Sequence, residues 1–559
     1  EPSASATPLT IHVHPNPQAT RAAASLTAGS RQPSVVAPGT TRAPLASLEG
    51  IFDTGATPPD TNGAVSSQYV VSTVNNAIDV KTRSGTSLMT KDLGAFWNVA
   101  GQTNSFDTRV RFDPYGQRFI VISAARFPDL SASGFAIAVS QTSDPTGGWW
   151  AWRITIETTN WLDYPTVGFN HNWIVVSANL PGNDNNPSFT RIWAFTKSAL
   201  YADNLSYRTL PGVGWTVQPA ETYDDTVSDE YMMRLDLDTG VSLYKVTGAI
   251  GSEQVVLVNA VSSPQSWSGP PAAPQTGSSA TLPTAEDWLL DAVYRNGSVW
   301  GTNVVQPSSG PPRSAVQWWK VSSSGALQDF GRIDDPTGVA YYGMSSVAVN
   351  KNGDALIGFT RFSADTHPSA AYAYRLSTDP AGTFRAPVVY KAGVGIYEGG
   401  RWGDYSHTQV DPVNDIDMWT VQEYTGAPAK WDTWWADVSP TSTACSTNAD
   451  CDDGVFCNGA ETCASGSCQA GTSWGQACYD ATPLSRYQNS GPIGTAEKWF
   501  VVTDNPINGW NASSVGSRQI RVNGVLVSPG QMPLPAPYNG KRYFQFTAGT
   551  PAYTSVNFW

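Results

Sequence analysis

The sequence predicts an all-β protein, with a seven-bladed β-propeller followed by a disulfide-rich spacer and a small C-terminal β-sandwich-like module. Three observations predict it. A short opening motif recurs through residues 46–440, all six cysteines lie in one short segment, and the chain is rich in turn and aromatic residues, with 50 Gly, 40 Pro and 22 Trp among 559 residues. Aromatic and β-branched residues pack on pleated surfaces, while Gly and Pro form the turns between strands.

Residues 1–45 are rich in Ala, Ser, Thr and Pro and lack hydrophobic periodicity, so we expect an N-terminal arm or linker. The first residues, "EPSASATPLT", lack the basic and apolar regions of a signal peptide, and we expect them to be a mature end. The chain has no run of 18 apolar residues, so we expect no membrane span.

Residues 46–440 repeat one element, in which turn residues and an acidic residue lead into a short apolar strand and then a second strand. Openings of this kind lie about 47 to 65 residues apart, which predicts seven propeller blades. A pair of β-sandwiches is the alternative, but it would not require a recurring opening motif. The openings lie at Asp60, Asp107, Asp163, Asp287 and Asp404, with weaker copies at Glu221 and Tyr342.

The cysteines follow one another at intervals of 6, 6, 6, 5 and 10 residues within residues 441–482. A tight, even cluster of this kind predicts disulfides, which need an oxidising compartment, and six cysteines allow 15 pairings. Zinc is the alternative, but the CxxC pairs typical of zinc sites are missing. We therefore expect a secreted, extracellular protein with disulfides among Cys445, Cys451, Cys457, Cys463, Cys468 and Cys478.

Residues 490–559 alternate strand-like runs, such as "KWFVVTD" and "RYFQFTAG", with turns. They predict a small β module. Large aromatic residues, which are many for its size, make it a candidate for carbohydrate binding; among them are Trp499, Trp510, Tyr538, Tyr543 and Trp559.

Several of these segments resemble known proteins. The strings "PPDTNGAV", "DAVYRNGSVWGT" and "RWGDYSHTQVDP" resemble secreted, myxobacterial-like bacterial β-propeller proteins, a largely uncharacterised family. The string "ADCDDGVFCNGAETC" is similar to the Cys-rich spacer of extracellular myxobacterial proteins. This resemblance implies a propeller fold and an extracellular location, and it implies no particular reaction.

The net charge of −13 and the pI near 4.8 exclude a basic surface for phosphates, so we expect no nucleic-acid partner. Tryptophans cluster in "GGWWAW", "QWWK" and "KWDTWW", and exposed ones would stack on sugar rings. Burial between blades is the alternative. We expect a monomer that binds an extracellular polysaccharide or a cell-surface glycan.

Because the inner strands of a propeller run in one direction, the blade openings gather at one mouth of the central channel. We therefore expect a partly acidic ring there, with Trp288 beside or just below it. The alternative is that each Asp only caps a turn. The candidate catalytic residues are Asp107, Arg109, Asp163, Tyr164, Arg401, Asp404, Tyr405 and His407.

Three uses of this ring compete. Glycoside hydrolysis needs a carboxylic acid and a carboxylate that flank the scissile bond. A polysaccharide lyase would use His407 or His171 as base, a tyrosine as proton donor, and an arginine against a uronate. Calcium binding would use oxygen ligands from Asp60, Asp107, Asp163 and Asp287, and we expect no organic cofactor.

The sequence thus predicts a secreted carbohydrate-active protein that acts on an extracellular polysaccharide, including anionic ones, by hydrolysis or lyase chemistry. The alternative is a non-catalytic adhesin or lectin-like protein.

Overall fold

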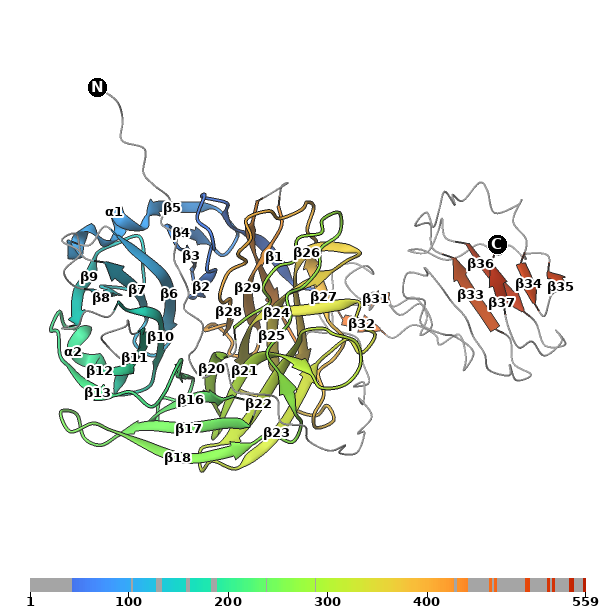
Figure 1. Cartoon of the computed structure of the whole chain (residues 1–559). Helices are drawn as coiled ribbons and strands as arrows, with labels where there is room; N and C mark the ends of the chain where they lie inside the picture. Colours follow the sequence, from blue (N-terminus) through green and yellow to red (C-terminus); the bar gives the residue numbers. More distant parts are fainter. Residues whose placement is uncertain are drawn as a thin grey trace, which may run out of the picture. The chain divides into compact units, whose positions relative to one another are not determined.

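The computed structural model describes residues 43–440, apart from 102–103, 127–132, 157–160, 182–188, 238, 287 and 427–429, together with seven short strands between residues 462 and 558. The chain divides at Pro440 into two compact units. The first holds the β-sheets that form the propeller, and Figure 1 shows these sheets arranged around a common centre.

Five four-stranded antiparallel sheets are separate blades. In four of them the strands follow chain order from the centre outward, as is typical of a propeller. One short strand interrupts this order: β15 lies between β14 and β16 in the chain but belongs to another sheet. These blades comprise β2 (Asn62–Val65), β3 (Tyr69–Val74), β4 (Ala77–Thr82) and β5 (Ser87–Asp92); β6 (Ser105–Asp113), β7 (Arg118–Arg126), β8 (Ser133–Ser140) and β9 (Trp149–Ile156); β14 (Gln218–Pro219), β16 (Glu230–Asp236), β17 (Gly240–Thr247) and β18 (Gln254–Ser262); and β24 (Ala340–Val349), β25 (Ala355–Ser363), β26 (Thr366–Arg375) and β27 (Val388–Lys391).

The fifth separate blade closes the ring. It pairs β28 (His407–Val410), β29 (Met418–Tyr424) and β30 (Asp432–Val438) with β1 (Ala46–Phe52) from the other end of the first unit. The backbone N–H of Ile51 donates to Oγ1 of Thr433 at 2.7 Å. Gln409 on β28 makes two hydrogen bonds to the backbone of Val65 on β2, which joins the last blade to the first.

The remaining strands of the ring form one ten-stranded sheet, and here the expectation of seven separate blades is corrected. Two four-stranded meanders are fused through the two-residue strand β15 (Glu221–Thr222), which lies parallel to the first strand of each. Near the axis the inner strands converge, so this short segment pairs with both neighbours at once. The sheet comprises β10 (Asp163–Phe169), β11 (Trp173–Leu180), β12 (Phe189–Thr196), β13 (Tyr207–Pro211), β15, β20 (Leu289–Arg295), β21 (Ser298–Pro307), β22 (Ala315–Ser322) and β23 (Leu327–Ile333), with β19 (Trp267–Ser268) beside β21.

The first strands of the meanders contact one another around the centre. Around the centre, the strands in contact follow the order β28, β2, β6, β10, β20, β24 and again β28, with β14 and β15 both between β10 and β20. Helices are short: α1 (Leu93–Trp97), η1 (Asn98–Ala100) and α2 (Lys197–Leu200). This closed circle brings the predicted openings to one place.

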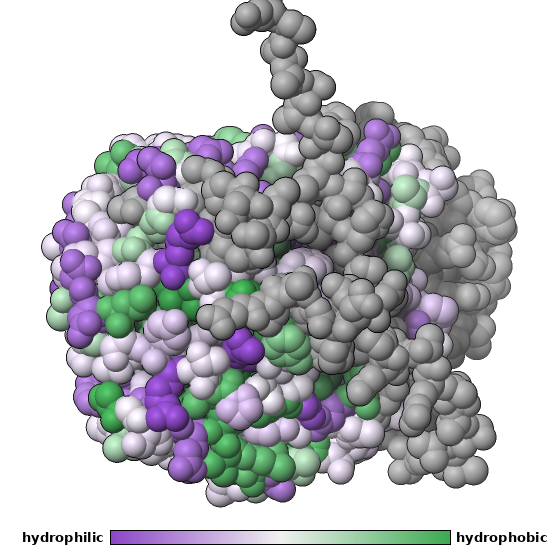
Figure 2. All heavy atoms as spheres, turned by 60° about the vertical axis from the view of Figure 1, so that its left-hand side comes forward, coloured by the Kyte–Doolittle hydropathy of each residue, from purple (hydrophilic) through white to green (hydrophobic). Residues whose placement is uncertain are grey.

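Half of the clustered tryptophans lie inside the blades. Trp318, Trp319, Trp431 and Trp435 are fully buried, whereas Trp434 and the tryptophans of "GGWWAW" are partly exposed. On the face seen in Figure 2, hydrophobic residues form small groups among hydrophilic ones. Burial in the core therefore accounts for half of these tryptophans, as expected for such a large apolar side chain.

The second unit is described only through short strands. β31 (Thr462–Ala464) and β32 (Ser467–Gln469) pair with Cys463 opposite Cys468. β33 (Lys498–Val502) pairs with β36 (Arg542–Phe546), and β34 (Ile520–Val522) lies between β35 (Val525–Val527) and β37 (Val556–Phe558). The other four cysteines and residues 1–42 lie outside the described residues, so the disulfides, the N-terminal arm and the sandwich-like module stay predictions. No helix in the described part is long and apolar enough to cross a membrane.

Candidate functional site

Backbone irregularities mark the start of several inner strands. The register shifts near Asp107 on β6, near Tyr164 on β10 and near Met344 on β24. These three residues have positive φ angles of 51°, 48° and 53°, a region that residues other than glycine rarely adopt. A bulge of this kind re-aims a side chain, and here it recurs where the strands approach the axis.

The openings converge on a pocket whose space is about 370 Å³, including the part open to solvent. The sequence predicted seven of its lining residues, with Trp288 among those expected beside the acidic ring, and it missed Glu286, which directly precedes the predicted Asp287. Asp287 itself lies outside the described residues. The pocket is lined by Asp60, Asp107, Asp163, Tyr164, Glu286, Trp288, Arg401 and Asp404.

Two of the carboxylates connect inner segments of different blades. The Asp60 carboxylate accepts the backbone N–H of Asp404 at 2.8 Å and the side-chain amide of Asn75. The Asp107 carboxylate accepts the backbone N–H of Tyr164 at 3.0 Å, while its own N–H donates to Asn75 Oδ1 at 2.7 Å. Asp60 and Asp107 are 1% and 6% exposed. Both carboxylates therefore accept backbone N–H groups of other blades, which is a structural role different from capping a turn.

Asp404 and Asp163 are more accessible. The side chain of Asp404 is 21% exposed, and its carboxylate pairs with the Arg401 guanidinium at 3.1 Å. Asp163 begins β10 and is partly exposed. These two carboxyl groups, together with that of the exposed Glu286, are the acidic groups that a bound molecule can reach.

Crowding raises the proton affinity of the pocket. Burial and the charge of Asp60 raise the pKa of Asp404 to about 8, although Arg401 opposes the rise. Burial and the charge of Asp404 raise the pKa of Asp163 to about 7. The pKa values of Asp60 and Asp107 also rise to about 7, chiefly through burial. Near neutral pH the pocket therefore holds both protonated and ionised carboxyl groups.

Three of the predicted residues form or support the floor of the pocket. The Arg109 guanidinium lies 4.8 Å from the ring centroid of Tyr164 and 3.8 Å from that of Tyr405. Its Nε–H donates to the carbonyl of Pro165 at 2.8 Å. Arg109 and Tyr405 are each 1% exposed, so only Tyr164 faces the pocket, and its ring also contacts Trp288 at 4.9 Å.

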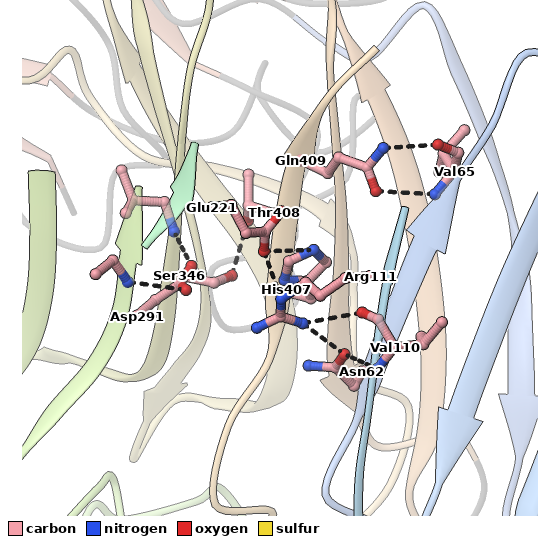
Figure 3. Close-up of polar contacts among 12 residues, drawn as sticks. Asn62, Val65, Val110, Arg111, Glu221, Asp291, Ser346, His407, Thr408 and Gln409 are labelled. Carbon is pink, nitrogen blue, oxygen red and sulfur yellow. Dashed lines mark hydrogen bonds and ion pairs between the residues drawn. The ribbon is translucent and has the colours of Figure 1, made fainter. Parts of the chain in front are cut away.

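His407 lies deeper still, and it does not line the pocket. Its Nε2 is 3.4 Å from Glu221 Oε1, which also pairs with Arg111 Nε at 2.6 Å (Figure 3). The histidine is fully buried, and burial and the charges of Arg111 and Arg109 keep its pKa well below the usual value. His171 lies on the surface, paired with Asp225 at 3.1 Å. Neither histidine can meet a substrate in the pocket.

Calcium binding gains no geometric support. Among the residues that the structure describes, no group of three or more His, Cys, Asp or Glu side chains is placed to hold a metal ion. Asp287 lies outside them, so the calcium site stays a prediction.

The fold and the pocket together define a β-propeller protein with an acidic pocket where its inner strands begin. No family model and no curated protein matches this chain. Among solved structures, it is similar to the polysaccharide lyase Uly1, at 10% identity and a TM-score of 0.36 over 71% of this chain and 99% of that one.

Two further similarities are to proteins of the sialidase type. The haemagglutinin-neuraminidase of parainfluenza virus 5 has 12% identity and a TM-score of 0.34 over 63% of this chain and 94% of that one. The Hadza microbial sialidase Hz136 has 10% identity and a TM-score of 0.33 over 68% of this chain and 65% of that one, so the match spans about two thirds of the sialidase. At this level, none of these similarities assigns a function to this chain.

Proposed function

We propose that this protein hydrolyses glycosidic bonds in the acidic pocket, with Asp404 as the general acid and Asp163 as the second carboxylate. The observation that carries the proposal is that two accessible carboxyl groups with raised pKa values line one small pocket. The proposed location of the protein is extracellular.

The chemistry follows from the protonation states. The protonated carboxyl of Asp404 would donate its proton to the glycosidic oxygen as the bond to the anomeric carbon breaks. The ionised carboxylate of Asp163 would stabilise the positive charge that develops on the sugar, and would activate water or attack the anomeric carbon. Because burial and the nearby carboxyl of Asp60 raise the pKa of Asp404, the acid keeps its proton close to neutral pH.

The partly exposed Trp288 supplies a surface for the sugar ring, and the buried Tyr164 packs against it. Tyr164 and Trp288 line the pocket with their rings 4.9 Å apart and tilted by 55°. The C–H faces of a pyranose pack on such rings, while the carboxylates accept hydrogen bonds from sugar hydroxyls.

The charge of the pocket favours hydrolysis over a lyase reaction. Five carboxyl groups face one guanidinium, that of Arg401, which is already paired with Asp404. A uronate would be repelled, so the proposed substrate is a neutral or basic glycan rather than an anionic one. A lyase also needs a base, but His407 is buried and burial raises the pKa of Tyr164 far above neutral.

A panel of glycans tests the proposal. The chain is incubated with arabinan, xylan, mannan, chitosan and polygalacturonate, while new reducing ends and the absorbance of unsaturated uronates are followed. We expect reducing ends from a neutral or basic glycan, and a loss of about 10²- to 10⁴-fold in kcat/KM for Asp404→Asn and for Asp163→Asn.

The matched control is Asp144→Asn, at a partly exposed carboxylate that caps the Thr146 turn, and it should leave turnover unchanged. Unsaturated products would establish the lyase instead. Retention on one glycan without any product would establish the adhesin or lectin-like alternative. Equal turnover by all variants would show that the pocket takes no part in the reaction.

A further inference from the structure

A turn in the first blade carries an asparagine that bonds to two of the inner segments. Asn75 lies between β3 and β4 and does not line the acidic pocket. Its backbone N–H donates to the carbonyl of Pro59 at 2.7 Å, and its side-chain amide donates to the carbonyl of Pro58 at 3.0 Å and to the Asp60 carboxylate. Its Oδ1 accepts the backbone N–H of Asp107 at 2.7 Å. This side chain therefore joins the segment before β2 to the start of β6.

These bonds belong to a chain of hydrogen bonds that connects the segments of the two proposed catalytic carboxyl groups. At one end, the Asp60 carboxylate accepts the backbone N–H of Asp404 at 2.8 Å. At the other end, the Asp107 carboxylate accepts the backbone N–H of Tyr164, the residue after Asp163, at 3.0 Å. The asparagine links the two halves. The chain thus runs from the segment before β28, in the closing blade, to the start of β10.

Three residues along this chain have a backbone conformation that needs support. Asp60, Asp107 and Tyr164 have φ angles of 52°, 51° and 48°, which residues other than glycine rarely adopt. Such conformations persist only where the surrounding structure holds them. Asn75 bonds to the side chain of Asp60 and to the backbone of Asp107, so we expect its removal to let both residues relax.

The spacing of two catalytic carboxyl groups decides how a glycosidic bond is hydrolysed. A separation of roughly 5–5.5 Å allows direct attack, one of roughly 6.5–9.5 Å leaves room for water, and a misplacement of about 1 Å can lower the rate about 10²-fold. We propose that Asn75 is a positioning residue, which sets the spacing between Asp404 and Asp163 through Asp60 and Asp107. This inference rests on the proposed function for the role of the two carboxyl groups.

Other contacts should preserve the fold when this link is removed. The backbone N–H of Gly403 donates to Glu423 Oε2 at 3.0 Å, and the Tyr397 hydroxyl donates to the carbonyl of Arg401 at 2.9 Å. On the other side of the pocket, β10 pairs with β11. We therefore expect the loss of the Asn75 amide to shift the two carboxyl groups and to leave the blades in place.

Asn75→Ala tests the inference, with Asn76→Ala as its matched control. Asn76 is the other residue of the same turn, and its side chain bonds to Thr54. On the glycan that the panel identifies, Asn75→Ala should lower kcat about 10- to 10²-fold with KM nearly unchanged, because the misplaced groups fail in the transition state. The control should keep both constants. Full kcat in folded Asn75→Ala overturns the inference.

A crystal structure of Asn75→Ala keeps the two proposals separable. The distance between the carboxyl carbons of Asp404 and Asp163 should change by more than about 0.5 Å relative to the unsubstituted chain, whether or not a glycan is cleaved. An unchanged distance overturns the inference while the proposed hydrolysis stands. If the unsubstituted chain cleaves no glycan, the hydrolysis fails and the distance still tests the link. Should Asn75→Ala not fold, Asn75→Ser, whose hydroxyl keeps one bonding group, is measured in the same two ways against the same criteria.

Discussion

Replacing Asp404 with Asn should abolish turnover and yet stabilise the protein at high pH. The folded-state pKa of Asp404 is raised, so the folded chain binds this proton more tightly than the unfolded chain does. The resulting stabilisation is complete below about pH 4 and is lost as the pH rises through about 8. Asp404→Asn cannot ionise, so the variant avoids that loss.

The size of the effect follows from the shift. One pKa unit corresponds to about 1.4 kcal/mol, so a rise from 3.8 to about 8 sets an upper limit of about 6 kcal/mol. The side chain is 21% exposed and shares its repulsion with Asp60, so we expect about 2 kcal/mol at pH 9. For a unit of about 400 residues, this is a rise of about 2 °C in Tm.

Thermal unfolding at about pH 5 and about pH 9 measures the effect. The Tm of Asp404→Asn relative to the unsubstituted chain should rise between the two pH values. Asp335→Asn is the matched control with the opposite sign, because burial raises the pKa of Asp335 but hydrogen bonds from Thr337 and Ala340 outweigh it and lower that pKa. A Tm for Asp404→Asn that is unchanged or lower at pH 9 would refute the reasoning.

The other predictions concern the pH profile, the closing strand and the polar links. Activity should fall as the pH rises through about 8, where Asp404 loses its proton, and a kcat/KM that is flat to pH 9 would exclude it as the acid. Leu48→Ala should lower the free energy of unfolding in urea by about 2–4 kcal/mol, because Leu48 on β1 is 8% exposed in the closing blade. Leu45→Ala, at 52% exposure, should lower it by under about 0.5 kcal/mol. Equal losses would contradict the closure of the ring by β1. Asp60→Asn should lower the free energy of unfolding by about 1–3 kcal/mol in the same assay, because its amide N–H would face either Asn75 Nδ2 or the Asp404 N–H. An unchanged free energy would contradict the hydrogen bonds from Asn75 and Asp404 to Asp60.

The acidic pocket was predictable because it depends on repetition. The inner strands share one direction, so residues that recur at their starts must meet, and Asp60, Asp107, Asp163 and Asp404 do. The same argument could have predicted Glu286, since it directly precedes the predicted Asp287 in "AEDW". An acidic pair before a strand leaves open which member faces the centre.

Depth along the axis was not predictable from the motif. His407 lies three residues after Asp404 in "DYSHTQ", at the first residue of β28, and its side chain is fully buried and contacts Glu221 instead of the pocket. A sequence shows that the two residues are neighbours, but not that a layer of Arg109 and Tyr405 separates one of them from the pocket. The fusion of two meanders through β15 escaped prediction for a related reason, because it depends on how closely the inner strands approach one another.

A crystal structure of Asp404→Asn soaked with a glycan that the unsubstituted chain cleaves tests the role of the pocket most directly. We expect a sugar ring against Trp288, with its glycosidic oxygen within hydrogen-bond distance of the side chain at position 404. A glycan bound on another face, with this pocket empty or its carboxyl groups turned away from the sugar, would contradict the proposed site.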